Sequence, residues 1–286
     1  MRKQRFNSLL GKDKNINPFR GCEHGCIYCD SRSNVYNIPG DFSDIIVKEN
    51  AVELLQKELS KKRKKYIVKT GSMCDPYTIS EKKLELTRKL LKVIDDNHFG
   101  VSILTKSDLI LRDMDLLLSI NKHSKAIVCF TLTTTDDALC KLVEPYASVA
   151  SKRIEALKKF NENGISTGVW MCPILPFIED NVENIQSIIR ACSEVGVKFI
   201  INFGMGTTIR DGSREYFYQK LDEKFPGIKA KYQQLFGYKY ECPSPRAMKL
   251  QKVFVEECNK YNIKYKWEDI KPLLDLENPC EQLSLF

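Results

Sequence analysis

The stretch that decides the fold is N-P-F-R-G-C-E-H-G-C-I-Y-C, residues 17–29. Its three thiols, Cys22, Cys26 and Cys29, have the spacing C-x3-C-x2-C, and Tyr28 directly precedes the last of them. A structural tetrahedral zinc site needs four ligands, so three thiolates this close together do not complete one. A cubane [4Fe–4S] cluster held by three cysteines keeps one iron open for another ligand. Two alternatives stay open: a zinc site completed by the histidine inside the motif or by a distant cysteine, and coincidence in a cysteine-rich chain.

Downstream of this motif, short apolar runs alternate with helical patterns. Each run has the near-continuous apolar character of a strand buried on both faces. The predicted strands are Tyr66–Thr70, Val101–Thr105, Ala126–Leu132, Ile165–Met171 and Val197–Asn202, and a first strand is expected near Phe19–Gly21. Such alternation implies parallel strands joined by right-handed crossovers, in an open sheet or in a full or partial barrel.

Helical periodicity and capping residues agree with this interpretation. Leu84, Thr87, Leu91 and Ile94 share one helix face, and two later segments, around residues 150–161 and 182–192, repeat the pattern. Ser80 is a predicted N-cap. Gly164 and Gly196 stand where glycines end helices.

The alternation is lost from about Asp211. An aromatic and basic run, YFYQKLDEKFPGIKAKYQQLFGYKY at residues 216–240, is followed by a predicted helix near Arg246–Lys260. We expect residues 1–210 to form the core and residues 211–286 to be an extension packed on it.

Composition narrows the class of protein. The chain has 286 residues, 43% of them hydrophobic, which excludes disorder as the main state. It has no run of the roughly 20 apolar residues that a membrane span needs, and its start lacks an apolar signal region, so we expect a cytoplasmic monomer. A net charge of +8 permits nucleic-acid binding without demonstrating it. The odd number of cysteines, 11, argues against a disulfide framework.

The motif and several later stretches resemble the radical S-adenosylmethionine (SAM) superfamily and, within it, the spore photoproduct lyase-like group, also called DNA repair photolyases. The resemblance extends over roughly residues 15–200. Besides the cysteine motif it is carried by Gly71–Glu81 (GSMCDPYTISE), Leu104–Ser107 (LTKS), Phe130–Thr133 (FTLT), Glu144–Ser148 (EPYAS) and Pro173–Asn181 (PILPFIEDN).

This resemblance implies an α/β fold, a partial (β/α)6 barrel of the TIM type with a C-terminal helical extension. It implies an enzyme whose [4Fe–4S] cluster binds SAM through the open iron. Reduction by a flavodoxin- or ferredoxin-type donor then cleaves SAM to methionine and a 5′-deoxyadenosyl radical, which abstracts a hydrogen atom from the substrate.

Candidate cofactor contacts follow the predicted strands, at the end where β/α barrels build active sites. Ser72 and Asp75 come after the Tyr66–Thr70 run and are suited to hydrogen-bond the amino group or ribose of a nucleoside. The resemblance places Lys106 at the carboxylate of SAM and a hydroxyl, here Thr131, on the cofactor, and Tyr28 is a further contact. Without the resemblance, Lys106 reads as a solvated lysine and Thr131 as an ordinary strand residue.

Other cysteines carry less information. Cys129, Cys140, Cys172 and Cys192 are expected in the core. Cys242, Cys258 and Cys280 lack an iron–sulfur spacing, so a second cluster is not expected. Glu144 and Arg153 are open to two interpretations, a structural salt bridge or a contact with the cofactor.

Departures from the lyase pattern bear on the substrate. The lyases carry a tyrosine directly after the third cluster cysteine, where this chain has Asp30. Alignment on Asp75 places their hydrogen-donating cysteine at Met73, one residue before Cys74, which is the candidate catalytic thiol here. These differences argue against repair of the spore lesion.

Three function classes remain. The favoured substrate is a nucleic acid or nucleotide, with bases stacked on tyrosines and phosphates met by lysines such as those of the run KKRKK at residues 61–65. That run equally suits the solvated end of a helix. The alternatives are radical modification of a small molecule or peptide, and a non-catalytic, metal-stabilised nucleic-acid-binding protein.

Overall fold

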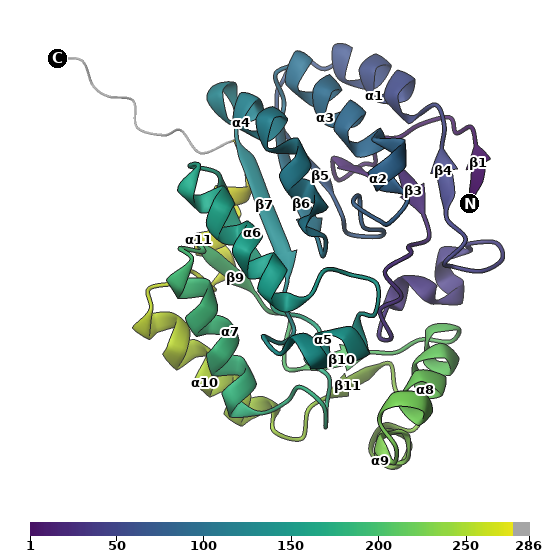
Figure 1. The fold of residues 1–286 in the computed structure, drawn as a ribbon, viewed down its shortest axis with the longest axis vertical. Helices are drawn as coiled ribbons and strands as arrows, with labels where there is room; N and C mark the ends of the chain where they lie inside the picture. The colour runs from purple at the N-terminus through teal and green to yellow at the C-terminus, as the bar shows by residue number, and fades with distance from the viewer. Residues whose placement is uncertain (277–286) are drawn as a thin grey trace.

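Six parallel strands form the central sheet, in the order β2-β5-β6-β7-β8-β9, and curve into a partial barrel (Figure 1). The structure, a computed structural model, describes residues 1–276. The strands are β2 (Asn15–Ile16), β5 (Ile67–Thr70), β6 (Gly100–Thr105), β7 (Ala126–Thr131), β8 (Ser166–Trp170) and β9 (Phe199–Ile201). The five apolar runs are therefore strands, and the predicted partial (β/α)6 barrel is confirmed.

The prediction that the first barrel strand lies near Phe19–Gly21 is wrong. Asn15–Ile16 opens the barrel by pairing with β5, whereas β3 (Phe19–Arg20) pairs antiparallel with β4 (Ile46–Lys48) in a small separate sheet that also contains β1 (Arg2–Gln4). The true first strand is too short to show a periodic pattern, and Pro18 follows it, a residue that donates no ladder hydrogen bond.

Helices cover the convex side of the sheet (Figure 1). Their bounds are α1 (Ala51–Ser60), α2 (Glu81–Leu84), α3 (Leu86–Asp96), α4 (Met114–His123), α5 (Asp137–Val143), α6 (Ala150–Glu162) and α7 (Val182–Glu194). The main core forms where outward-facing strand residues such as Val68, Val128 and Val169, all fully buried, meet these helices.

Two of the three predicted caps are as expected. Gly164 and Gly196 both adopt φ +76°, the left-handed conformation that ends α6 and α7. Ser80 precedes α2, but its side chain makes no capping hydrogen bond. The predicted helix through Leu84 is interrupted at Glu85, whose left-handed φ of +49° separates α2 from α3.

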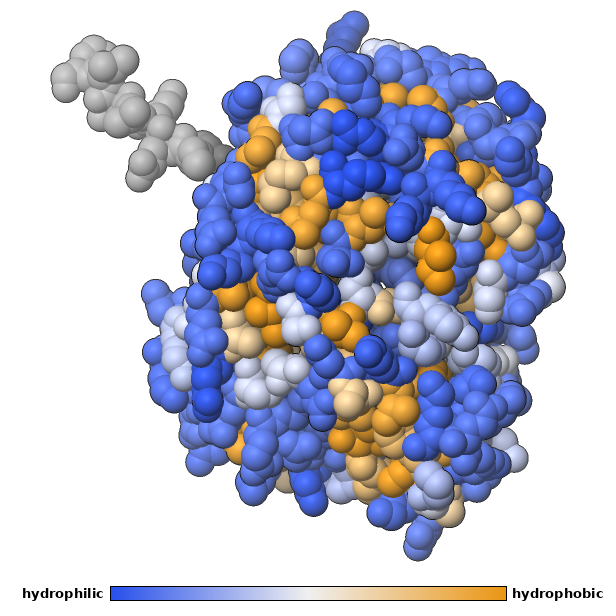
Figure 2. Space-filling model, in the orientation of Figure 1, coloured by the Kyte–Doolittle hydropathy of each residue, from blue (hydrophilic) through white to orange (hydrophobic). Residues whose placement is uncertain are grey.

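The C-terminal extension is largely helical. It contains α8 (Ser213–Lys224), α9 (Ile228–Phe236), α10 (Ala247–Lys260) and α11 (Trp267–Ile270), with β11 (Glu241–Pro243) paired to β10 (Gly206–Thr208). Helix α10 joins the main core beside α7. On the face shown in Figure 2, hydrophilic residues predominate and hydrophobic ones form smaller patches.

The basic run 61–65 and the aromatic run 216–240, which the sequence suggested as nucleic-acid contacts, have structural explanations. The basic run 61–65 lies between α1 and β5, at the amino end of the strands, opposite the end where the cysteine motif lies. In the aromatic run, Phe217, Tyr218, Tyr232 and Phe236 are buried in a second core cluster. Among residues 1–276, no helix combines the length and the apolar character that a bilayer span requires.

Candidate active site at the carboxyl end of the barrel

The cysteine motif forms a loop anchored by backbone hydrogen bonds to three other segments. Cys22 N–H donates to the carbonyl of Phe42 (3.0 Å), Ile27 N–H to Val143 (2.9 Å), and the His24 carbonyl accepts from Tyr146 N–H (3.1 Å). The loop is thus held in place at its start, middle and end without help from its thiols.

A carboxylate ties this loop to the segment after β5. Glu23 accepts hydrogen bonds from the Thr78 hydroxyl (2.9 Å) and from the backbone N–H and hydroxyl of Ser80 (both 2.7 Å). Ser80 is therefore a loop anchor, because its hydroxyl is engaged by Glu23 instead of capping α2. Gly71 begins this segment at φ +100°, and a Cβ there would lie 1.8 Å from the Leu104 carbonyl, so only glycine fits.

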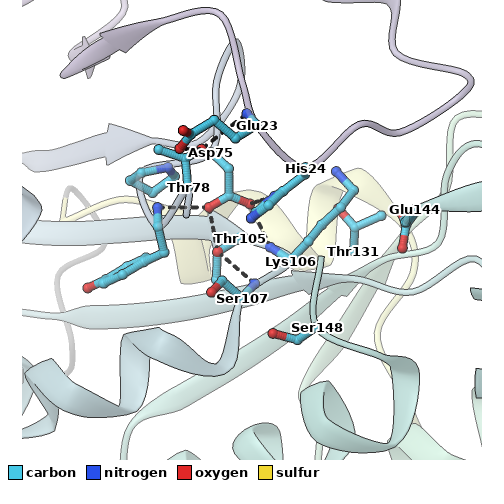
Figure 3. Close-up of polar contacts among 12 residues, drawn as sticks. Glu23, His24, Asp75, Thr78, Thr105, Lys106, Ser107, Thr131, Glu144 and Ser148 are labelled. Atoms are coloured by element: carbon cyan, nitrogen blue, oxygen red, sulfur yellow. Dashed lines mark hydrogen bonds and ion pairs between the residues drawn. The ribbon is translucent and has the colours of Figure 1, made fainter. Parts of the chain in front are cut away.

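Asp75 is the centre of the polar network shown in Figure 3. Its carboxylate accepts from Tyr77 N–H (2.9 Å), the Thr105 hydroxyl (2.6 Å) and Lys106 N–H (2.7 Å), and it pairs with His24 Nδ1 at 3.3 Å. Burial alone would raise the pKa of Asp75, but His24 and the hydrogen bonds outweigh it and lower that pKa. Since protein donors occupy both carboxylate oxygens, Asp75 holds the ends of β5 and β6 together. Its oxygens therefore have less capacity to accept hydrogen bonds from a ligand than the sequence suggested.

Lys106 extends β6 beyond its last residue, and its backbone is held on both sides. Its N–H donates to Asp75, and its carbonyl accepts from Ser148 N–H at 3.0 Å. The side chain runs toward Thr131 and Glu144 (Figure 3). Burial lowers the pKa of Lys106, but the nearby Cys26, Glu144 and Asp75 outweigh it and raise that pKa, so the ammonium stays charged beside the cluster loop.

Tyr28 and Thr131 lie on either side of a buried ion pair. The Tyr28 hydroxyl donates to Glu144, which pairs with Arg153. Arg153 is 1% exposed and also donates to the carbonyls of Thr131 (2.9 Å) and Ser148 (2.7 Å). Glu144 and Arg153 therefore form a structural salt bridge that links the Tyr28 side chain to the end of β7.

The three motif thiols are partly or fully buried in the loop: Cys26 is buried, and Cys22 and Cys29 are partly buried. Among residues 1–276, no three His, Cys, Asp or Glu side chains converge as ligands of one metal ion. Burial raises the pKa of Cys26 and of Cys29. His24 Nδ1 pairs with Asp75 at 3.3 Å, which fixes the orientation of its ring.

The remaining cysteines do not all lie where the sequence placed them. Cys74 is 4% exposed and donates to the Phe19 carbonyl at 3.0 Å, so its thiol faces the main core. Cys140 and Cys192 are core residues, as expected. Cys129, 2% exposed, is also a core residue, as expected, and it borders a cavity inside the barrel. Cys172 is only partly buried, near Lys106, so the prediction that it is a core residue is wrong.

Cys242 and Cys258 are buried in different core clusters, which separates them as ligands of a common group. Cys280 lies outside the described residues.

Sequence reasoning missed the residues that organise the site. Glu23 and Thr105 orient the loop and Asp75, yet nothing in their local sequence marks them. Cys172 had a usable signal, because it follows a predicted strand at the carboxyl end, two residues after an inward-facing position. Ser72, by contrast, is exposed and lines the barrel cavity.

Comparisons with known proteins agree with this geometry. Residues 16–192, more than half of the chain, match the model of the radical SAM superfamily. An uncharacterized protein of Methanocaldococcus jannaschii is 39% identical over 167 residues, which is 58% of this chain and 61% of the relative, so less than two thirds of that relative's length is matched. An uncharacterized protein of Mycobacterium bovis is 26% identical over 83% of this chain and 72% of its own.

Solved structures show the same fold. Spore photoproduct lyase, in a variant with bound AdoMet and dinucleoside spore photoproduct, has a TM-score of 0.60 at 17% identity, covering 86% of this chain and 73% of that one. Streptococcus suis SuiB bound to S-adenosylmethionine has a TM-score of 0.52 at 14% identity, covering 88% and 49%. The family uses a [4Fe–4S] cluster and SAM, and the cysteine loop and barrel described above are the parts that this chemistry requires. The chain belongs to the radical SAM superfamily and is an enzyme with the fold of spore photoproduct lyase.

Proposed function

We propose that Cys22, Cys26 and Cys29 hold the cluster and that SAM binds between the cluster and Lys106, so that a hydrogen atom is removed from a substrate inside the barrel. When bound, the cluster and SAM supply a 5′-deoxyadenosyl radical for this step. The observation that best supports the proposal is the half-buried, charged ammonium of Lys106, which lies near Cys26 and whose backbone Asp75 holds at the end of β6.

Each remaining contact has a separate task in this proposal. Ser72 and Thr131 offer hydroxyls at the ends of β5 and β7, and Tyr28 offers its ring because its hydroxyl is already bound to Glu144. Asp75 acts by positioning Lys106 through the backbone. The enclosing loops exclude water from the reacting atoms. A one-electron donor of the flavodoxin or ferredoxin type is the natural reductant.

The test of this function is direct. Anaerobically reconstituted protein is reduced with dithionite in the presence of SAM, and 5′-deoxyadenosine and methionine are quantified by chromatography. We expect both products in equal amounts. A protein that binds the cluster and SAM yet forms neither product under these conditions would contradict the proposal.

Substitution of Lys106 by alanine should weaken SAM binding without loss of the cluster. A charge-assisted ammonium–carboxylate contact contributes about 1.5–3 kcal/mol, so the Kd for SAM should rise by roughly one to two orders of magnitude. Equilibrium dialysis measures the affinity, and iron content measures the cluster. Lys198→Ala is the matched control, because Lys198 is exposed at the amino end of β9. Equal affinities in the two variants would show that Lys106 is a solvated lysine.

The protein should cleave SAM without efficiently repairing the spore-type thymine dimer. Asp30 replaces the lyase tyrosine, and its carboxylate accepts from the Tyr36 hydroxyl (3.3 Å) and pairs with Arg210 (3.3 Å), so it offers no hydrogen-atom relay. Met73, a thioether, offers none either. An anaerobic assay with the dinucleotide lesion and SAM measures thymine release. Repair that keeps pace with SAM cleavage would contradict this expectation, and its loss in Cys74→Ala would then identify Cys74 as the donor.

A further inference from the structure

The concave side of the barrel encloses a cavity of about 300 Å³. Inward-facing residues alternate along the strands and form tiers, as in other β/α barrels. Ile67, Ile127 and Phe199 fill the lowest tier, where Phe199 occupies the space that a side chain at position 168 would need. The cavity lies at the level of the next tier, toward the carboxyl ends of the strands.

The lining of this cavity combines aromatic rings with one cation. Trp170, Phe203 and Trp267 contribute rings, Lys69 contributes an ammonium, and no acidic residue is among the described residues of the lining. The Trp170 and Phe203 rings lie 5.5 Å apart at 71°, and Phe203 is 72% exposed although it is a large apolar residue. An exposed aromatic pair at a cavity is a surface on which a planar ring can stack.

The cavity lies next to the proposed SAM site. Leu104, Cys129 and Trp170, on three neighbouring strands, line the cavity. Two positions after each of them along the chain come Lys106, Thr131 and Cys172. Two residues of strand advance by about 6.5 Å, so a ligand in the cavity lies one tier below the cofactor contacts.

The C-terminal segment limits how large that ligand can be. Trp267 of α11 and Leu274, in the turn Lys271–Leu274, line the cavity, and Ile270 packs with Ile127 and Phe199 beneath it. A volume of about 300 Å³ is at the small end of ligand pockets. It suits one ring system with a small substituent better than two linked nucleosides.

We propose that this cavity binds the substrate as a single planar heteroaromatic ring that carries an anionic group, with the ring on Trp170, Phe203 and Trp267 and the anion on Lys69. The proposal rests on the proposed function, since it takes the cavity as the place where hydrogen is abstracted. A free nucleotide and a base displaced from a nucleic-acid strand share this chemistry, and the experiment separates them.

Intrinsic fluorescence gives a direct measurement, because the two tryptophans of the chain both line the cavity. The reconstituted protein is titrated with thymidine and adenosine 5′-monophosphates, with the corresponding nucleosides, and with a single-stranded oligothymidylate of eight nucleotides. Trp170→Phe and Trp267→Phe assign the signal to each ring. We expect saturable quenching by at least one monophosphate, or by the oligonucleotide if the base comes from a strand.

Variants test the two parts of the proposal. Lys69→Gln should weaken binding of the anionic probe by about 10- to 100-fold and leave nucleoside binding unchanged. Phe203→Ala should weaken binding of the anionic probe and of the nucleoside by about fivefold or more. Because the Phe203 side chain is exposed, we expect this variant to fold normally. Lys62→Gln, in the exposed basic run at the other end of the barrel, is the matched control.

Three outcomes would overturn the proposal: no quenching by any of these probes, equal affinity for nucleosides and monophosphates, or equal losses in the Lys69 and Lys62 variants. SAM cleavage without substrate is measured in parallel. If the unaltered protein cleaves SAM but binds none of the probes, the failure concerns the substrate class alone, whereas absence of SAM cleavage in the unaltered protein concerns the proposed function.

Discussion

Simultaneous replacement of Cys22, Cys26 and Cys29 by alanine should abolish the iron–sulfur cluster and all SAM cleavage. The anaerobically reconstituted protein is expected to bind about four irons and four sulfides, as a cubane with one open corner requires. The triple variant should bind none at this site, because the three thiolates are the protein's contribution to the cluster. Iron and sulfide analysis and the visible absorption spectrum measure the loss.

The fold should survive this change, since backbone hydrogen bonds to Phe42, Val143 and Tyr146 hold the loop. Circular dichroism checks this point. A matched control replaces three buried cysteines of the main core, Cys140, Cys192 and Cys258, which should leave the iron content unchanged. If the motif variant keeps the full spectrum and the control loses it, the cluster belongs to other cysteines.

Arg153→Leu should lower the free energy of unfolding by about 3–5 kcal/mol, because it leaves the buried Glu144 carboxylate without its counter-ion. Both side chains are 1% exposed, so solvent cannot replace the lost partner. The substitution also removes the donors to the Thr131 and Ser148 carbonyls. Urea denaturation of the apoprotein, monitored by circular dichroism, measures the change.

The double variant Glu144→Gln with Arg153→Leu distinguishes charge from packing. Removal of both charges should lower the free energy of unfolding by clearly less than the two single variants do in sum, since residues in direct contact are coupled. Additive losses would show that the pair contributes by packing alone. Lys159→Leu is a suitable control, because Lys159 pairs with Glu155 on the exposed face of the same helix, where ion pairs contribute little.

Much of the fold could be predicted because its information is local. Strands such as Ala126–Thr131 are buried on both faces, so their residues form uninterrupted apolar runs. Glycines at the ends of α6 and α7 mark positions of left-handed backbone. The first strand escaped prediction, because Asn15–Ile16 is defined by its pairing with β5 and not by a pattern of its own.

In the candidate site, too, local features could be predicted from the sequence and tertiary contacts could not. A thiol spacing is preserved in any fold that keeps the loop together, so the cysteine motif and the residues after each strand could be read directly. The partners of those residues could not. In the sequence, Asp75 looks like a ligand contact. In the structure, Thr105, Lys106 and His24 occupy both of its carboxylate oxygens.

The sequence by itself determined the superfamily, the succession of strands and helices, and which end of the barrel carries the chemistry. These properties depend on residue spacing over short distances. Only the tertiary structure decided that Glu144 and Arg153 form a buried pair, that Cys74 faces the core, and that both tryptophans line one cavity. The physical reason is that the cavity exists only when β5 to β9 curve together, so that alternate side chains from distant segments share one enclosed space above the C-terminal helix α11.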